Sequence, residues 1–234
     1  MSLAIVYTRA ALGIEAPLIT VEVHLSNGLP GLTMVGLPET TVKEARDRVR
    51  SALINSGYAF PAKKITINLA PADLPKEGGR YDLPIALALL VASEQLNTTR
   101  LNQYEFVGEL ALTGGLRGVP GAIPSAMEAI KAGRRIVVSS DNAAEVGLIG
   151  GSDCLVADHL QEVCAFLAGQ TSLSPPLAEA PARDERYEDL LDVIGQQQGK
   201  RALEIVAAGG HNLLLIGPPG TGKTMLASRL PGLH

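Results

Sequence analysis

Eight consecutive residues near the end of the chain have the types and spacing of a phosphate-binding loop. The segment Gly217-Pro-Pro-Gly-Thr-Gly-Lys-Thr224 matches G-x-x-x-x-G-K-[ST] at every fixed position. Glycines allow several backbone N–H groups to converge on phosphate oxygens, and a helix that follows adds the positive end of its dipole. Lys223 can reach the β and γ phosphates, and the Thr224 hydroxyl can coordinate the Mg²⁺ that bridges them. The predicted nucleotide contacts of this loop are Gly217, Pro218, Pro219, Gly220, Thr221, Gly222, Lys223, Thr224 and Met225.

The residues on either side predict the elements that position this loop. An apolar run predicts a strand at 212–216 that enters the loop, and a helix-compatible stretch leaves it at 225–230. A further helix is predicted at 198–208, ended by Gly209-Gly210. A chance glycine turn is the alternative interpretation, and this context argues against it.

The segment after the loop is short. No hydrophobic strand ending in paired acidic residues follows, and ten residues remain after Thr224. The second magnesium ligand and the group that orients the attacking water are therefore missing from the sequence pattern. We expect a fragment that binds ATP without hydrolysing it, while its parent is an ATPase.

Strand and helix patterns alternate before residue 169, which favours an α/β (α+β) layer fold for a first domain at 1–169. Prolines and small polar residues predict a linker at 170–186, and a second domain begins at 187 and occupies 187–234. The predicted strands are 4–8, 19–25, 65–69, 135–139 and 153–157, with two short strands and a turn between 106 and 115. The predicted helices are 41–57, 85–96, 125–132, 142–149 and 160–167.

Two of these helices carry recognisable end signals. Thr41 and Glu44 form a capping box at the start of the first helix, and Gly57 occupies the position of its C-terminal cap. The second helix is apolar nearly all round and is expected to be buried. Asp82 is its predicted N-cap, with Pro84 in the first turn.

Composition narrows the class of protein. With 46% hydrophobic and 19% charged residues and a net charge of −4, the sequence predicts a globular, cytoplasmic protein without a membrane span or secretory signal. Cys154 and Cys164 are interpreted as buried thiols, and the four histidines lack the spacing of a metal site. The mildly acidic balance argues against a nucleic-acid footprint over the whole surface but leaves room for a local basic groove.

Two parts of the sequence resemble a known family. The stretch from Asp192 to Ala227 resembles the opening of an AAA+ ATPase domain of the magnesium-chelatase-like group. Segments 31–38, 68–73 and 108–110 resemble the bacterial ComM/YifB proteins. The resemblance implies a hexameric, ring-forming ATP- and Mg²⁺-dependent motor that acts in DNA branch migration during recombination or transformation. It also implies that three residues before the first helix of this domain lie near the adenine: Val193, Ile194 and Gly195.

The first domain resembles the fold shared by the Lon protease domain and the second domain of ribosomal protein S5. The resemblance would place a nucleophilic serine at the position held by Asp82 and a lysine near Ile123, after Gly121 and Ala122. Neither a hydroxyl nor an amine stands at these positions, so acyl-transfer chemistry is not expected. The sequence predicts a non-proteolytic domain that serves in binding or assembly.

DNA contacts are harder to assign. Arg46 and Arg50 share a helix with Glu44 and Asp47, which is typical of a solvated face. The glycine-containing loop 76–80, with a cation at each end, is a better candidate for a DNA contact than this helix. A plain turn that leads into the buried helix explains the sequence of this loop equally well. A protein-interaction adaptor that serves a chaperone-like ATPase remains the alternative function. The remaining candidate cations are Arg48, Lys63, Lys64, Arg117, Arg134 and Arg135.

Overall fold

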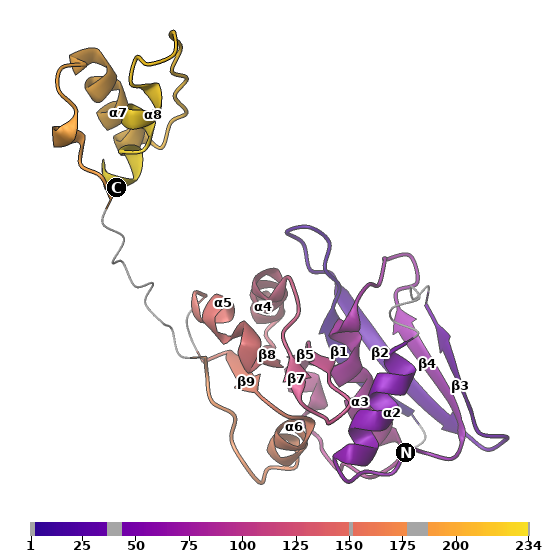
Figure 1. Ribbon diagram of the computed structural model, residues 1–234. Helices are drawn as coiled ribbons and strands as arrows, with labels where there is room; N and C mark the ends of the chain where they lie inside the picture. Colours follow the sequence, from indigo (N-terminus) through magenta and orange to yellow (C-terminus); the bar gives the residue numbers. More distant parts are fainter. Residues whose placement is uncertain (1–2, 37–43, 150–151, 177–186, 234) are drawn as a thin grey trace. The chain divides into compact units, whose positions relative to one another are not determined.

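The computed structural model describes residues 3–36, 44–149, 152–176 and 187–233. The chain forms two compact units, Met1–Glu179 and Ala180–His234 (Figure 1). Within the described residues, no helix has the length and apolar character that crossing a membrane requires.

The N-terminal unit is built on a seven-stranded mixed sheet with the strand order β3-β4-β2-β1-β5-β8-β9. Strand β2 runs antiparallel to both of its neighbours, and the other neighbouring pairs are parallel. A separate two-stranded hairpin joins β6 and β7. The strands are β1 (Leu3–Arg9), β2 (Leu18–Ser26), β3 (Gly31–Val35), β4 (Lys64–Ala70), β5 (Tyr104–Phe106), β6 (Glu109–Leu110), β7 (Leu116–Arg117), β8 (Arg135–Ser139) and β9 (Cys154–Ala157).

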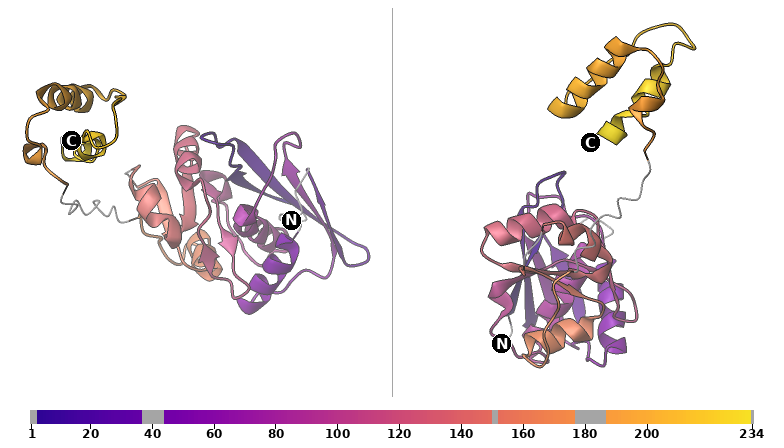
Figure 2. Two further views of the ribbon diagram at one scale, coloured as in Figure 1. Left: turned by 45° about the horizontal axis from the view of Figure 1, so that its top comes forward. Right: turned by 90° about the vertical axis from the view of Figure 1, so that its left-hand side faces the viewer.

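Helices cover the two faces of this sheet unequally (Figure 2). In the larger core, the helices α2, α3 and α6 pack on one face of the sheet. In the smaller core, the helices α4 and α5 pack against β8 and β9 on the other face. The helices are α2 (Ala45–Asn55), α3 (Asp82–Ala92), α4 (Ala122–Lys131), α5 (Ala143–Gly147) and α6 (Leu160–Leu167), with single 3-10 turns at Gly79–Tyr81, Leu101–Gln103 and Ser140–Asn142.

The predicted α/β class is confirmed, and several elements lie where the sequence places them. Strand β8 and helix α6 have the predicted bounds. Gly57 has a φ of +82° just after α2, as expected of a residue beyond a helix C-terminus. Helix α2 begins at Ala45 with Glu44 as its N-cap, so Glu44 does not occupy the third helical position that the predicted capping box gives it; Thr41 lies outside the described residues. Strand β3 was not predicted as an element of its own, since its five residues lie between two glycine–proline turns.

The predicted N-cap of the buried helix is wrong. Helix α3 begins at Asp82 itself, its N-cap is Tyr81, and no side chain caps it. The Asp82 carboxylate instead accepts hydrogen bonds from Arg48 and from the backbone N–H of Leu110. The helix also ends at Ala92, earlier than predicted, and Glu94 follows in the left-handed conformation with a φ of 62°.

Part of the predicted linker packs on the N-terminal unit. The N–H of Val156 in β9 donates to the carbonyl of Ser174 over 3.0 Å. Leu173 is partly buried against the larger core. Residues 171–176 therefore follow the edge of the sheet before the described part of this unit ends.

The C-terminal unit contains two helices, α7 (Gln197–Gly209) and α8 (Lys223–Ala227), and two 3-10 turns, Leu190–Asp192 and Leu230–Leu233. Helix α7 confirms the helix predicted at 198–208, within one residue at each end. The strand predicted at 212–216 is wrong, because residues 211–218 carry no regular structure. Leu214 is 80% exposed and Ile216 is 86% exposed. A strand needs a neighbour for its backbone groups, and the described residues of this unit contain no strand.

Candidate functional site

The loop at residues 217–222 connects the extended segment to α8. Gly222 is the N-cap of α8, with a φ of +81°, and Gly220 has a φ of +82°. Both values lie in the left-handed region, which glycine enters without steric strain. The glycines of the motif therefore allow the chain to curl immediately before Lys223, the first residue of the helix.

Five successive backbone amides at the end of this loop are available to a ligand. Within the described part of the chain, no hydrogen-bond acceptor is recorded for the N–H groups of Gly220, Thr221, Gly222, Lys223 and Thr224. An exposed run of unpaired N–H groups at a helix start attracts an anion, since each group carries a partial positive charge. The arrangement suits phosphate oxygens.

Lys223 lies over the same loop. Its ammonium donates to the carbonyls of Gly217 and Pro218 over 2.9 and 2.8 Å. The Thr221 hydroxyl also donates to the Pro218 carbonyl, over 2.9 Å. The positive charge of Lys223 is thus held at the loop, and Thr224 is exposed in the first turn of α8.

A pocket of about 420 Å³ adjoins the loop. It brings Val193 and Ile194, two of the residues predicted to lie near an adenine, together with Met225. Val193 is buried, whereas Ile194 is 96% exposed. Gly195 lies between this pair and α7 with a φ of +74° but does not line the pocket. The remaining lining residues are Asp192, Gln196, Gly220, Thr221, Gly222 and Leu226.

Two further contacts hold this site together, and neither was predicted from the sequence. Gln196 donates from its side-chain amide to the Thr221 carbonyl over 3.1 Å. Arg229 is buried and bonds to Glu188 over 2.8 Å and to the Met225 carbonyl over 2.9 Å. Neither residue belongs to the loop motif. The only signal for Gln196 is its place directly after Gly195, in a run of polar residues before the helix.

The position that the Lon resemblance assigns to a nucleophile carries a buried ion pair. Asp82 is fully buried, and its two oxygens accept from Arg48 over 2.7 and 3.0 Å. Burial raises the pKa of Asp82 to about 6, while the hydrogen bond and charge of Arg48 lower it and the nearby Glu109 raises it further. Ile123 lies in the first turn of α4, directly after Gly121 and Ala122. A carboxylate engaged in this way joins α2 to α3.

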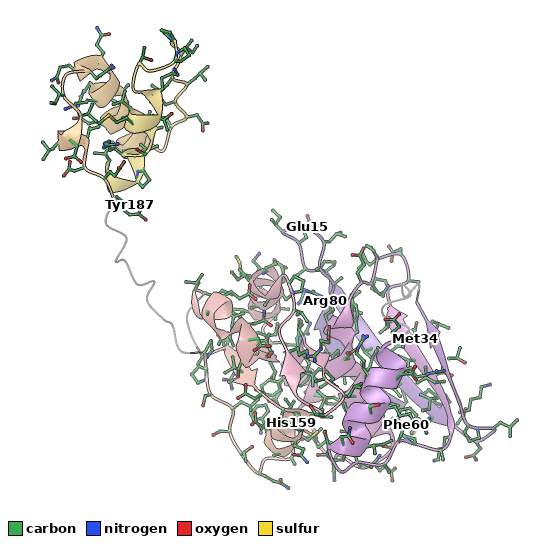
Figure 3. The ribbon with its side chains drawn as sticks, viewed as in Figure 1. Glu15, Met34, Phe60, Arg80, His159 and Tyr187 are labelled. Carbon is green, nitrogen blue, oxygen red and sulfur yellow. The ribbon has the colours of Figure 1, made fainter. Side chains whose placement is uncertain are left out.

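The cations of the loop 76–80 face inward, which fits the plain turn that was the alternative to a DNA contact. Lys76 is fully buried and donates to the carbonyls of Pro71 and Leu74. Arg80 is buried and donates to the carbonyls of Arg9 and Pro120 (Figure 3). Both side chains donate hydrogen bonds to backbone carbonyls of neighbouring segments. Burial lowers the pKa of both cations.

Both cysteines are buried free thiols, as the sequence predicts. Burial raises the pKa of Cys154, and it raises that of Cys164 to about 11. A thiol with a raised pKa is a poor nucleophile and a poor metal ligand. The two residues therefore serve as small core side chains.

Both compact units match models of known protein families. Residues 21–142 match the family model described as subunit ChlI of Mg-chelatase, and residues 189–234 match that of magnesium chelatase, subunit ChlI. The chain is 77% identical to protein YifB of Salmonella typhimurium over 233 residues and 75% identical to protein YifB of Escherichia coli. It is 59% identical to the competence protein ComM of Haemophilus influenzae over 240 residues.

These matches cover the whole of this chain but only 46–47% of each of the three relatives. The chain thus spans about half the length of the curated relatives it matches. One family model covers more than half of the chain, and the identity to the relatives extends across both compact units. The chain belongs to the ComM/YifB family of magnesium-chelatase-like proteins.

Proposed function

We propose that residues 187–234 bind ATP with Mg²⁺ and form the first part of an AAA+ ATPase domain. The observation that carries this proposal is the run of five amides from Gly220 to Thr224 without acceptors, beside the ammonium of Lys223. Backbone N–H groups and a lysine in this arrangement suit the β and γ phosphates.

Each part of the site has a role in the proposal. The amides of Gly220 to Thr224 bind phosphate oxygens, and Lys223 turns from the loop carbonyls to the γ-phosphate. The Thr224 hydroxyl binds Mg²⁺, which neutralises phosphate charge when it is bound. The adenine enters the pocket beside Val193, Ile194 and Met225. Gln196 keeps that pocket next to the phosphate loop.

Hydrolysis is proposed for the longer protein rather than for this chain. Among the described residues that line the pocket, Asp192 is the one carboxylate, and it lies on the side of the predicted adenine contacts. We propose that the second magnesium ligand and the group that orients the attacking water come from residues after His234. The 234-residue chain should then bind ATP without turning it over.

We further propose that the longer protein is a cytoplasmic, ring-forming motor that acts on DNA. Supporting this are the 59% identity to a competence protein and the match to an ATPase-type family across both units. In this proposal, the N-terminal unit is a domain similar to the Lon protease and ribosomal S5 folds that holds DNA or organises the ring. The buried Asp82–Arg48 pair supports a role without proteolysis, because it leaves no free nucleophile at that position.

The second candidate function is an adaptor domain that binds a protein partner for the ATPase. The exposed apolar side chains Leu3 and Ile5 on the face of β1 turned away from the larger core favour it. A salt titration of the full-length protein with labelled DNA separates the two. If the unit binds DNA, counterion release makes its affinity fall steeply as ionic strength rises. If it is an adaptor, no binding to DNA is expected at any salt concentration.

The nucleotide proposal is tested in the full-length protein by the variant Lys223→Ala. ATP hydrolysis should fall to background, because the γ-phosphate loses its cation. Lys200→Ala, in α7 of the same unit, is the matched control and should hydrolyse ATP at the wild-type rate. Undiminished hydrolysis by Lys223→Ala contradicts the proposal.

A further inference from the structure

A second pocket, of about 400 Å³, lies on the N-terminal unit between α2, the start of β3 and the segment that leads into β4. Three cationic side chains line it: Arg46, Arg50 and Lys63. Among its described lining residues, Asp47 is the one carboxylate. We call this site the basic pocket; its other lining residues are Pro30, Gly31, Leu32, Phe60, Pro61, Ala62 and Ile65.

The two arginines lie one turn apart on α2, so their Cβ atoms are separated by about 5–6 Å. Two successive phosphates of an extended strand can meet such a pair. Arg46 bonds to Asp47 over 3.0 Å, but both side chains are more than half exposed. An exposed pair of this kind contributes about 1 kcal/mol at most, so a phosphate can take the place of the carboxylate.

Arg50 and Phe60 form a platform at the wall of the basic pocket. The guanidinium carbon of Arg50 lies 5.4 Å from the centre of the Phe60 ring, and Phe60 is labelled beside α2 in Figure 3. A guanidinium supported by an aromatic ring can stack on a nucleobase while it faces a phosphate. Leu32 and Ile65 give the pocket an apolar floor against which a base can pack.

Several other cations of this unit are engaged elsewhere. Lys76 and Arg80 are buried and bond to backbone carbonyls. Arg9 and Arg134 both bond to the buried Glu105. Lys63 is exposed. The charge of Glu94 interacts with that of Lys63, but Glu94 does not line the basic pocket. The basic pocket is therefore where accessible positive charge, an aromatic ring and a concave apolar surface coincide.

We infer that the basic pocket binds a single-stranded nucleic acid, with its phosphates on Arg46, Arg50 and Lys63 and a base against the Arg50–Phe60 platform. This inference rests on the DNA-directed function proposed above and gives that function a site outside the phosphate loop. A single strand fits better than a duplex, because a base must leave its stack to enter a pocket. Pockets of about 300–1,000 Å³ hold small ligands, so one nucleotide unit has room.

The test uses the 234-residue chain and a fluorescent oligothymidylate, with anisotropy measured at several salt concentrations. The double variant Arg46→Ala/Arg50→Ala should bind about tenfold more weakly at low salt. Its log–log salt slope should be shallower by about 0.7 for each cation removed. Lys63→Ala should change affinity and slope in the same direction, by about half as much.

Lys131→Ala is the matched control, because Lys131 is an exposed lysine on α4, paired with Glu128, and does not line the pocket. Its affinity and slope should equal those of the wild type. Thermal unfolding of each variant establishes that the fold is kept, which is expected because Arg46, Arg50 and Lys63 are exposed.

Three results would overturn the inference. The first is wild-type affinity in the double variant. The second is the absence of salt-dependent binding by the wild-type chain. The third is displacement of the oligothymidylate by thymidine monophosphate at equal concentration, which would indicate a small-molecule site. DNA-stimulated ATP hydrolysis by the full-length protein is measured separately; if it persists in the double variant, the proposed DNA function stands while this site does not.

Discussion

Gln196 donates a hydrogen bond from its side-chain amide to the backbone carbonyl of Thr221, over 3.1 Å. The contact joins the segment before α7 to the middle of the phosphate loop, across 25 positions of the sequence. Gln196 itself has a φ of +54°, an unfavourable conformation for a residue with a Cβ. The contact is therefore a specific feature of this site, and it couples the adenine side of the pocket to the phosphate side.

Removing this contact should weaken nucleotide binding moderately. We expect Gln196→Ala to bind ATP about threefold more weakly, since one hydrogen bond at an exposed site contributes about 0.5–1 kcal/mol. Isothermal titration calorimetry of the 234-residue chain measures the change. Gln197→Ala, at the first position of α7, is the control and should leave the affinity unchanged. Equal affinities for both variants and the wild type would show that Gln196 does not position the loop.

The buried Asp82 should make stability depend on pH. Its pKa is raised from 3.8 to about 6 in the folded protein, mainly by burial. The folded state therefore binds the proton more tightly, and the stabilisation is fully present below about pH 4 and lost as the pH rises through about 6. A difference of roughly two pKa units corresponds to about 3 kcal/mol.

Comparison with Asp82→Asn isolates this effect, because asparagine does not ionise. We expect the free energy of unfolding of the wild type, relative to the variant, to decrease by about 2–3 kcal/mol between pH 4 and pH 6.5. Urea unfolding at a series of pH values measures it. Asp47→Asn, which removes an exposed carboxylate from α2, is the matched control. A wild type that gains stability over Asp82→Asn as the pH rises would contradict the account.

We expect the glycine at position 36 to be essential for the stability of the sheet edge formed by β3. Its φ is +97°, and a Cβ at this position would lie 2.2 Å from the carbonyl oxygen of Leu69. The backbone there cannot move aside cheaply, so Gly36→Ala should destabilise the N-terminal unit by at least about 2 kcal/mol. Gly31→Ala is the control, because its nearest neighbour would be 3.9 Å away. Urea unfolding should separate the two variants; similar midpoints would refute the steric explanation.

The sequence predicted those elements whose signals are local. Strand β8 and helix α6 have the predicted bounds. The all-apolar pattern after Asp82 correctly indicated a buried helix, because no polar face was left for water. Gly220 and Gly222 of the phosphate loop have left-handed φ values, which their residue type permits.

The remaining features depend on partners distant in the sequence. Residues 212–216 have an apolar strand pattern but form no strand, because no neighbouring strand is present among the described residues of that unit. Asp82 has the residue type of an N-cap, yet its carboxylate is drawn to Arg48, which lies 34 positions away. Lys76 and Arg80 look like surface cations, and only the fold shows that both side chains are buried and bond to backbone carbonyls. The basic pocket joins α2 to β3 and β4, and residue spacing does not reveal that contact.

The most direct test of the account is calorimetric titration of the 234-residue chain with ATP and Mg²⁺. The wild type and Lys200→Ala should bind with the same affinity, and chelation of Mg²⁺ should weaken both. Lys223→Ala should bind at least tenfold more weakly, because the loop amides then hold the phosphates without their cation. Binding by Lys223→Ala as tight as that of the wild type would contradict the claim that residues 217–224 hold the triphosphate.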